Sequence, residues 1–213
     1  MPERLASSST ARGELVLRRR GEQLELISNG TFLMDTSNGE SERAMADLAL
    51  DGLCADARIL IGGLGFGFTL AQTLTHAVGE VVLVELEADV VAWNEQWWPL
   101  GDAALRDSRV RVEIADFAHY VREADEPFDA VLVDIDNGPD WTVADPNTEV
   151  YDELLPELRR VLRAPAGRLC IWSAARSDAF SARLAKHFRQ VSRHEIPVPR
   201  GDPDVLYLAV GAP

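Results

Sequence analysis

Acidic side chains gather at the end of one strongly apolar segment of the chain. The segment FDAVLVDIDNGPDW is apolar until it reaches Asp134, Asp136 and Asn137, and it then breaks at Gly138 and Pro139. Carboxylates at the end of a buried strand lose solvation, which favours a functional role for them. Two carboxylates that face one site can bind a cation or share a proton between them. The alternative is that Asp136 or Asn137 only caps the turn.

A glycine-rich turn is the second candidate. The segment RILIG runs into GLGFG, and a helix is expected to begin near Phe68. Glycines permit a sharp turn and close approach of a ligand, and a helix N-terminus supplies N–H groups. Glu85 ends the next apolar segment, VVLVE, about twenty residues later, where a carboxylate can accept both ribose hydroxyls of a nucleoside. The alternative is a tight turn and an exposed glutamate. The predicted cofactor-binding residues here are Gly62, Gly63, Leu64, Gly65, Gly67, Glu85 and Leu86, and Asp134 is predicted to contact the cofactor as well.

The segment VRVEI leads to Asp116 and Phe117, which we expect at the same edge of the sheet and include in the cofactor site. The Asp116 carboxylate can accept the amino hydrogens of adenine, or it can cap the helix FAHYVREA, and the two roles are compatible. An NAD-type fingerprint needs a third glycine where this chain has Phe68, so NAD is disfavoured.

The remaining candidates have structural alternatives. Trp93, Trp97 and Trp98 lie at helical spacing and can stack on an adenine or a substrate ring. Core packing or a subunit interface is the favoured interpretation, and a homodimer is one expected state. Trp141 and Tyr151 can line an acceptor pocket or serve packing alone. His119 can act as a proton acceptor at the site, but a surface or interface position is favoured. The histidines and cysteines lack metal-ligand spacing, so no metal site is predicted.

Elements that position these residues follow from the hydrophobic pattern. From Ala57 onward, segments apolar on both faces alternate with helical segments, which predicts a mostly parallel twisted sheet with helices on both faces. An apolar stripe predicts a helix from Glu149 to Leu162, and QVSRHEIPV with DVLYLAV predicts a closing hairpin. The expected fold class is α/β and Rossmann-like.

The N-terminal part has a different pattern. Residues 14–35 carry short alternating runs broken by Gly21 and Asn29-Gly30, which predict a small antiparallel hairpin, and Glu40 to Leu50 predicts a helix. The expected division is a flexible terminus over 1–13, an appendage over 14–50 and the Rossmann-like domain over 51–213.

Bulk properties exclude several classes. The formal net charge of -14 opposes binding to nucleic acid, and the run Arg18-Arg19-Arg20 is interpreted as a solvated strand edge. No apolar stretch predicts a signal sequence or a membrane span. Two distant cysteines predict no disulfide framework, and we therefore expect a cytoplasmic protein.

Five segments together resemble the spermidine synthase family: ILIGGLGFG, VVLVELEADVV, VEIADF, FDAVLVDIDNGP and the hairpin LELISNGTFLMDT. The resemblance extends over about residues 14–210 and implies the class I methyltransferase fold with an antiparallel final strand. It implies that Glu85 holds the ribose, that Asp116 lies by the adenine, and that Asp134 deprotonates the attacking amine.

Departures from the family pattern concern charge. The family has an aspartate that holds the amine of decarboxylated S-adenosylmethionine, and Gly65 aligns with it. A glutamine and a Tyr-His pair of the family align with Leu33, Glu42 and Arg43, and the second acid of its strand-end motif aligns with Asn137, next to Asp136. Bare N–H groups at Gly65 favour a cofactor that keeps its carboxylate.

The expectation drawn from these residues is a methyltransferase that uses S-adenosylmethionine on a small-molecule acceptor, with Asp134, Asp136 and Asn137 as catalytic residues. The first alternative is a polyamine aminopropyltransferase that uses decarboxylated S-adenosylmethionine. The second is a nucleoside-binding domain without catalysis.

Overall fold

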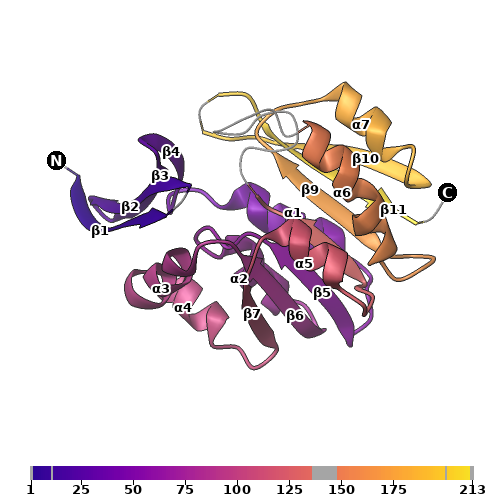
Figure 1. The fold of residues 1–213 in the computed structure, drawn as a ribbon, viewed down its shortest axis with the longest axis horizontal. Helices are drawn as coiled ribbons and strands as arrows, with labels where there is room; N and C mark the ends of the chain where they lie inside the picture. The colour runs from indigo at the N-terminus through magenta and orange to yellow at the C-terminus, as the bar shows by residue number, and fades with distance from the viewer. Residues whose placement is uncertain (1, 11, 136–147, 200, 212–213) are drawn as a thin grey trace.

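The computed structural model describes residues 2–10, 12–135, 148–199 and 201–211. These residues form a four-stranded sheet followed by a seven-stranded sheet with helices (Figure 1). The α/β, Rossmann-like prediction is confirmed. Within these ranges, no helix is both long enough and apolar enough to span a membrane.

The large sheet has the strand order β10-β11-β9-β8-β5-β6-β7. All neighbours from β9 to β7 pair in parallel, and β11 pairs antiparallel with both β9 and β10, as expected for the closing hairpin. The strands are β5 (Ala57–Gly62), β6 (Val78–Glu85), β7 (Val110–Ile114), β8 (Ala130–Val133), β9 (Arg168–Ser173), β10 (Gln190–Ile196) and β11 (Asp204–Val210).

Both faces of this sheet are covered because its strands are apolar on both sides. Ile59 and Ile61 pack in one buried cluster, whereas Leu60 between them packs in the other. The first cluster includes side chains of α1 (Glu40–Leu50), α2 (Phe68–Thr75), α3 (Ala88–Trp97) and α4 (Pro99–Leu105). The second includes side chains of α5 (Phe117–Glu123), α6 (Thr148–Arg160) and α7 (Asp178–Leu184).

The N-terminal sheet is larger than the predicted hairpin. Its strands are β1 (Glu3–Thr10), β2 (Gly13–Arg20), β3 (Gln23–Ser28) and β4 (Thr31–Asp35), in that order. The expectation of a flexible terminus over 1–13 is therefore wrong for β1, which pairs antiparallel with β2. The alternation in RLASSST is too polar to signal a strand, so only its pairing with β2 reveals it.

Two further expectations are corrected. The arginine run does not lie on a sheet edge, because β2 lies between β1 and β3. Arg18 and Arg20 instead both pair with Glu25 of β3, a carboxylate only 5% exposed. Helix α1 has the predicted bounds, but its buried residues Met45 and Ala49 belong to the core of the large sheet. It therefore packs with the main domain rather than with the N-terminal appendage.

Figure 1 shows the N-terminal sheet beside the main body, next to α3 and α4. Leu17, Leu24 and Leu26 of this sheet are buried in the first cluster, which also contains Ile59 and Ile61 of the large sheet. Arg12 pairs with Glu87 at 2.7 Å, and the Arg19 guanidinium lies 5.7 Å from the centre of the Trp97 ring. The sheet is therefore attached to the segment that directly follows Glu85.

Candidate functional site

The glycine-rich turn joins β5 to α2 in a conformation that requires glycine. Gly63, Gly65 and Gly67 all have positive φ, of 90°, 51° and 71°. A Cβ on Gly63 would lie 2.1 Å from the backbone oxygen of Asp134. The turn therefore lies directly against the end of β8, and both predicted sites come together at one edge of the sheet.

Glu85 is fixed beneath this turn. Its Oε2 accepts the Leu64 N–H at 2.8 Å and its Oε1 accepts the Glu87 N–H at 2.8 Å. The side chain is 8% exposed, and burial raises its pKa while the backbone N–H groups act in the opposite direction. The alternative of an exposed glutamate is not what the structure shows. A carboxylate held from two sides keeps its remaining lone pairs available in a fixed direction.

Asp116 caps helix α5. Its Oδ1 accepts the His119 N–H at 2.8 Å, while the side chain of Asp116 stays exposed. Phe117 is buried in the core, so any ligand contact from it would involve its backbone. Leu86 and Ile114 are 37% and 51% exposed at the ends of β6 and β7. These two apolar surfaces suit the faces of a flat ring, and Ile114 was not among the predicted residues.

Asp134 follows the last residue of β8. Its N–H donates to the Gly62 oxygen at 2.9 Å, and its Oδ2 accepts a hydrogen bond from Thr69 Oγ1 at 2.7 Å. Burial raises its pKa to about 7, with a further contribution from the charge of Glu42. A carboxyl group with such a pKa can exchange a proton near neutral pH.

Other predicted site residues are placed as follows. Asp136, Asn137 and Trp141 lie outside the described residues. Tyr151 is 4% exposed and meets the Phe180 ring edge-on, so packing is its observed environment. His119 is exposed, as expected.

The tryptophans pack within the chain. Trp93 is 8% exposed, and Trp98 Nε1 donates to the Phe66 oxygen at 2.9 Å. Asn94 between them donates from Nδ2 to the Gly65 oxygen at 2.8 Å. Asn94 of α3 and Trp98, the residue that follows this helix, thus each bind one carbonyl of the glycine-rich turn. The homodimer stays a prediction.

Two further carboxylates lie near Asp134. The Ser41 Oγ lies 2.7 Å from Asp204 Oδ2 and 2.9 Å from Glu42 Oε2, and it accepts a hydrogen bond from Trp172 Nε1 at 3.2 Å. Burial raises the pKa of both Glu42 and Asp204. In the sequence, Glu42 is identified only as a departure from the family pattern, and its place beside Asp134 is not predicted. Nothing local marked Asp204, because its contact with α1 depends on the folded chain.

The charge of Arg43 lowers the pKa of Glu42, against the larger effect of burial, but Arg43 forms no ion pair with this carboxylate in the described ranges. Across the described ranges, Glu42, Asp134 and Asp204 have no ion-pair partner, and the Arg43 guanidinium instead lies 4.7 Å from the centre of the Phe68 ring. The same ranges contain no group of His, Cys, Asp and Glu arranged for a metal. Unpaired, partly buried carboxylates favour a cationic ligand.

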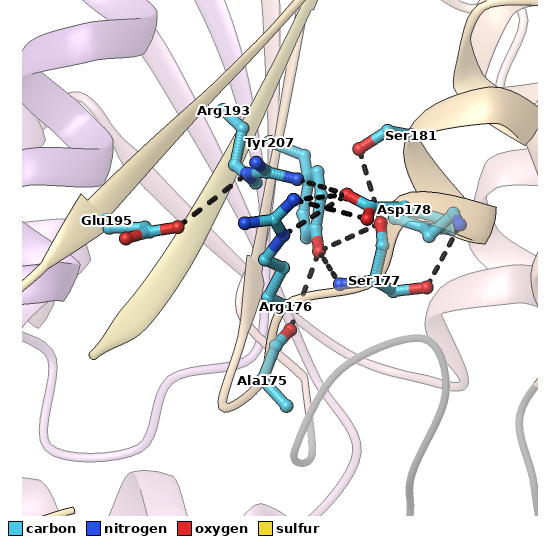
Figure 2. A network of polar contacts seen from close by, with 9 residues as sticks. Ala175, Arg176, Ser177, Asp178, Ser181, Arg193, Glu195 and Tyr207 are labelled. Carbon is cyan, nitrogen blue, oxygen red and sulfur yellow. Dashed lines mark hydrogen bonds and ion pairs between the residues drawn. The ribbon is translucent and has the colours of Figure 1, made fainter. Parts of the chain in front are cut away.

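The loop after β9 borders the same edge and is held firmly (Figure 2). The Ser177 N–H donates to the buried Tyr207 hydroxyl at 2.6 Å, and Ser177 Oγ accepts the Phe180 N–H at the start of α7. Arg176 and Arg193 converge on Asp178, and hydrogen bonds from Arg193 and Arg176 hold its pKa below the usual range. The two arginines here are thus paired with a carboxylate, whereas the carboxylates beside Asp134 have no ion pair within the described ranges.

The fold is that of a class I transferase, with a mostly parallel seven-stranded sheet and the candidate site residues at the carboxyl ends of its strands. Solved structures agree at the level of fold. Spermidine synthase from Thermotoga maritima has a TM-score of 0.79 at 15% identity, covering 98% of this chain and 72% of that chain. A spermidine synthase in complex with the transition-state analogue AdoDATO has a TM-score of 0.81 at 16% identity, covering 98% and 73%.

The family itself is shown by sequence. The model of the spermine/spermidine synthase domain matches residues 41–163, and the chain belongs to this family. A polyamine aminopropyltransferase of Korarchaeum cryptofilum is 32% identical over 138 residues, which cover 62% of this chain and 42% of the relative. One of Ruegeria sp. (strain TM1040) is 29% identical over 126 residues, covering 53% and 44%. The matched segment spans less than half the length of these relatives.

These findings correct the functional expectation. A methyltransferase was predicted from the missing charge at Gly65, but the family and the relatives are those of aminopropyl transfer. The prediction of methyl transfer is wrong. Its physical premise was also incomplete, because Glu42 and Asp204 supply negative charge from outside the turn.

Proposed function

We propose that this chain is an aminopropyltransferase that moves the aminopropyl group of decarboxylated S-adenosylmethionine to a polyamine or diamine acceptor. The observation that carries the proposal is the carboxylate cluster of Glu42, Asp134 and Asp204, which has no ion-pair partner in the described ranges. Membership of the spermine/spermidine synthase family supports the reaction class.

Charge complementarity favours these substrates over intact S-adenosylmethionine. The decarboxylated form carries a sulfonium and an ammonium, whereas the intact form adds a carboxylate. A carboxylate 4 Å from a cation contributes about 4 kcal/mol of attraction at an effective dielectric of 20, and repels an anion to the same extent. The cluster beside Asp134 therefore favours a donor and an acceptor that both carry only positive charge.

The nucleoside part of the donor fits the opposite end of the site. Glu85 is held in position by Leu64 and Glu87 and can accept both ribose hydroxyls. Leu86 and Ile114 offer exposed apolar surface for adenine at the adjacent strand ends. Asp116, although it caps α5, remains exposed and keeps acceptor capacity for an amino group.

In the proposed reaction, Asp134 takes up the proton that the attacking amine loses. The amine nitrogen forms a bond to the methylene carbon next to the sulfonium, and the carbon–sulfur bond breaks. The electron pair of that bond stays on sulfur, which gives the neutral thioether methylthioadenosine. Thr69 orients the Asp134 carboxylate through its 2.7 Å hydrogen bond, and the pKa of about 7 suits proton uptake near neutral pH.

The test is product analysis. The protein is incubated with decarboxylated S-adenosylmethionine and a panel of diamines and polyamines, and methylthioadenosine and the aminopropylated amine are quantified by mass spectrometry. We expect the native chain to form both products in equal amounts. We expect Asp134→Asn to form them at no more than about 1% of the native rate. Binding of the donor without any product across the panel would contradict the proposal.

A further inference from the structure

Residue 65 is enclosed on two sides. On one side, the Gly65 carbonyl accepts a 2.8 Å hydrogen bond from Asn94 Nδ2. The φ of 51° at Gly65 fixes the direction in which a side chain would leave the backbone. In that direction lies Met34 of β4. A Cβ at position 65 would be 2.6 Å from Met34 Sδ and 3.2 Å from its Cε. The Met34 thioether therefore occupies the space that a side chain at position 65 would need.

Met34 is held over the turn by the whole N-terminal sheet. Strand β4 pairs with β3 through Met34 and Leu26, and Leu26 is buried in the main core. The sheet is attached to the start of α3 by the ion pair of Arg12 with Glu87, whose own N–H binds the Glu85 carboxylate. The half-buried thioether of Met34 thus has a defined position relative to the Glu85 carboxylate, the proposed ribose acceptor.

The turn beneath Met34 spans the space between the two ends of the site. At one end, Leu64 donates to Glu85, and at the other, Gly63 lies against the Asp134 carbonyl. A donor whose ribose is held by Glu85 and whose reacting carbon lies at Asp134 must pass its sulfonium and aliphatic chain over residues 63–65. Met34 covers that path with an apolar, polarisable group and without charge.

We propose that Met34 is a specificity-determining residue that contacts the aliphatic chain carried by the sulfonium and sets the width of its path over Gly65. This inference rests on the proposed function for the identity of the chain. Methylene groups next to a sulfonium carry partial positive charge, which a thioether sulfur accommodates better than a fixed dipole of the wrong sign. The N-terminal sheet is therefore a part of the catalytic domain's ligand site.

The first test compares two ligands by calorimetry: decarboxylated S-adenosylmethionine, which has the chain, and methylthioadenosine, which lacks it. We expect Met34→Ala to weaken the first about tenfold and the second less than about twofold, because only the first loses packing. Met34→Leu should stay within about threefold for both, since volume is retained. Leu5→Ala, a half-buried apolar deletion elsewhere in the sheet, controls for general loosening.

Equal weakening of both ligands, or none, with normal turnover would overturn the role of Met34 while leaving the proposed function intact. Failure of the native chain to bind either ligand would instead overturn the nucleoside site, and both proposals with it. The two failures are therefore distinguishable.

The second test needs no ligand. Gly65→Ala should destabilise the native chain more than it destabilises the Met34→Ala variant. In that variant the alanine at position 34 leaves room for the methyl group added at position 65. Gly67→Ala is the matched control. Gly67 also has positive φ, but a Cβ there would approach Gly101 Cα at 3.4 Å rather than Met34, so the cost of this substitution should be equal in both backgrounds. Additive costs for Gly65→Ala in urea unfolding would show that the contact is absent and overturn the inference.

Discussion

The N–H of Leu64 in the glycine-rich turn donates a 2.8 Å hydrogen bond to Oε2 of Glu85, so a single carboxylate joins the turn to the neighbouring strand. Its second oxygen accepts the N–H of Glu87. Glu85 therefore has a structural role, as an acceptor for two backbone donors, in addition to its proposed role at the ribose. A substitution at this position must affect stability and ligand binding together.

Glu85→Ala is expected to weaken methylthioadenosine binding by about 10- to 100-fold, because a carboxylate that accepts from hydroxyls contributes about 1.5 to 3 kcal/mol. It should also lower the free energy of unfolding by about 1 to 3 kcal/mol, since two N–H groups lose their acceptor. Calorimetry and urea unfolding measure the two effects, with the exposed Glu95→Ala on α3 as control. Unchanged affinity in a folded variant would remove Glu85 from the site.

Asp134→Asn is expected to lower turnover by about 10² to 10⁴ while donor affinity changes only a few-fold. The amide keeps the shape and can still accept from Thr69, but it cannot take up the proton of the amine. Steady-state rates with saturating donor and acceptor give the comparison. Normal turnover of the variant would make Asp134 structural, and Asp136, which lies outside the described residues, would be the next residue to test.

The same substitution should change stability with a defined pH dependence. Burial raises the pKa of Asp134 from 3.8 to about 7, so the folded state favours its protonated form. The stability that this group contributes is present below its unfolded pKa and is lost as the pH rises through about 7. Asp134→Asn escapes this loss and should be more stable than the native chain by about 1 to 3 kcal/mol at pH 8, with a smaller gain at pH 5. Urea unfolding at both pH values checks the sign.

Sequence patterns located the parts of the site that depend on local order. Parallel strands end at one edge of a sheet, so an apolar run followed by Glu85 and another followed by Asp134 were enough to bring these carboxylates together. The glycine string marked the turn because three of its residues require positive φ. The sequence of residues 40–50 also predicts the helix that the structure has there.

What the sequence did not give depends on contacts between distant segments. Asp204 approaches Ser41 across 163 positions, and no pattern in either segment signals this contact. The error about methyl transfer has the same origin. The missing charge at Gly65, considered alone, predicts a preference for a cofactor that keeps its carboxylate, but Glu42 and Asp204 place carboxylates near Asp134 from other elements.

Acceptor binding should be coupled to release of protons. Glu42, Asp134 and Asp204 all have pKa values raised by burial, and Asp134 is raised further by Glu42, so a diamine that carries positive charge will favour their ionised forms. We expect the affinity for a diamine to rise between pH 6 and pH 8, as Asp134 ionises. Calorimetry at pH 6 in two buffers of different ionisation enthalpy measures the proton release. Proton uptake, or an affinity independent of pH, would place the acceptor away from this cluster.

Two substitutions should shift the pH dependence of the reaction in opposite directions. Asp134 must be ionised to accept a proton, so kcat/KM should rise as the pH passes through its pKa of about 7. Glu42→Gln removes a neighbouring negative charge that raises this pKa, and the rise should move to lower pH. Thr69→Val removes the hydrogen bond that stabilises the carboxylate, and the rise should move to higher pH.

The matched control is Glu40→Gln, which removes an exposed carboxylate from the same helix as Glu42 and should leave the pH profile in place. Because Glu42→Gln and Thr69→Val are both close to isosteric, a loss of packing common to the two variants would lower kcat/KM without moving the midpoint. Opposite movements of the midpoint therefore report on the electrostatic environment of Asp134 rather than on structural damage. If both midpoints moved in the same direction, or if neither moved, the titrating base would be a group other than Asp134.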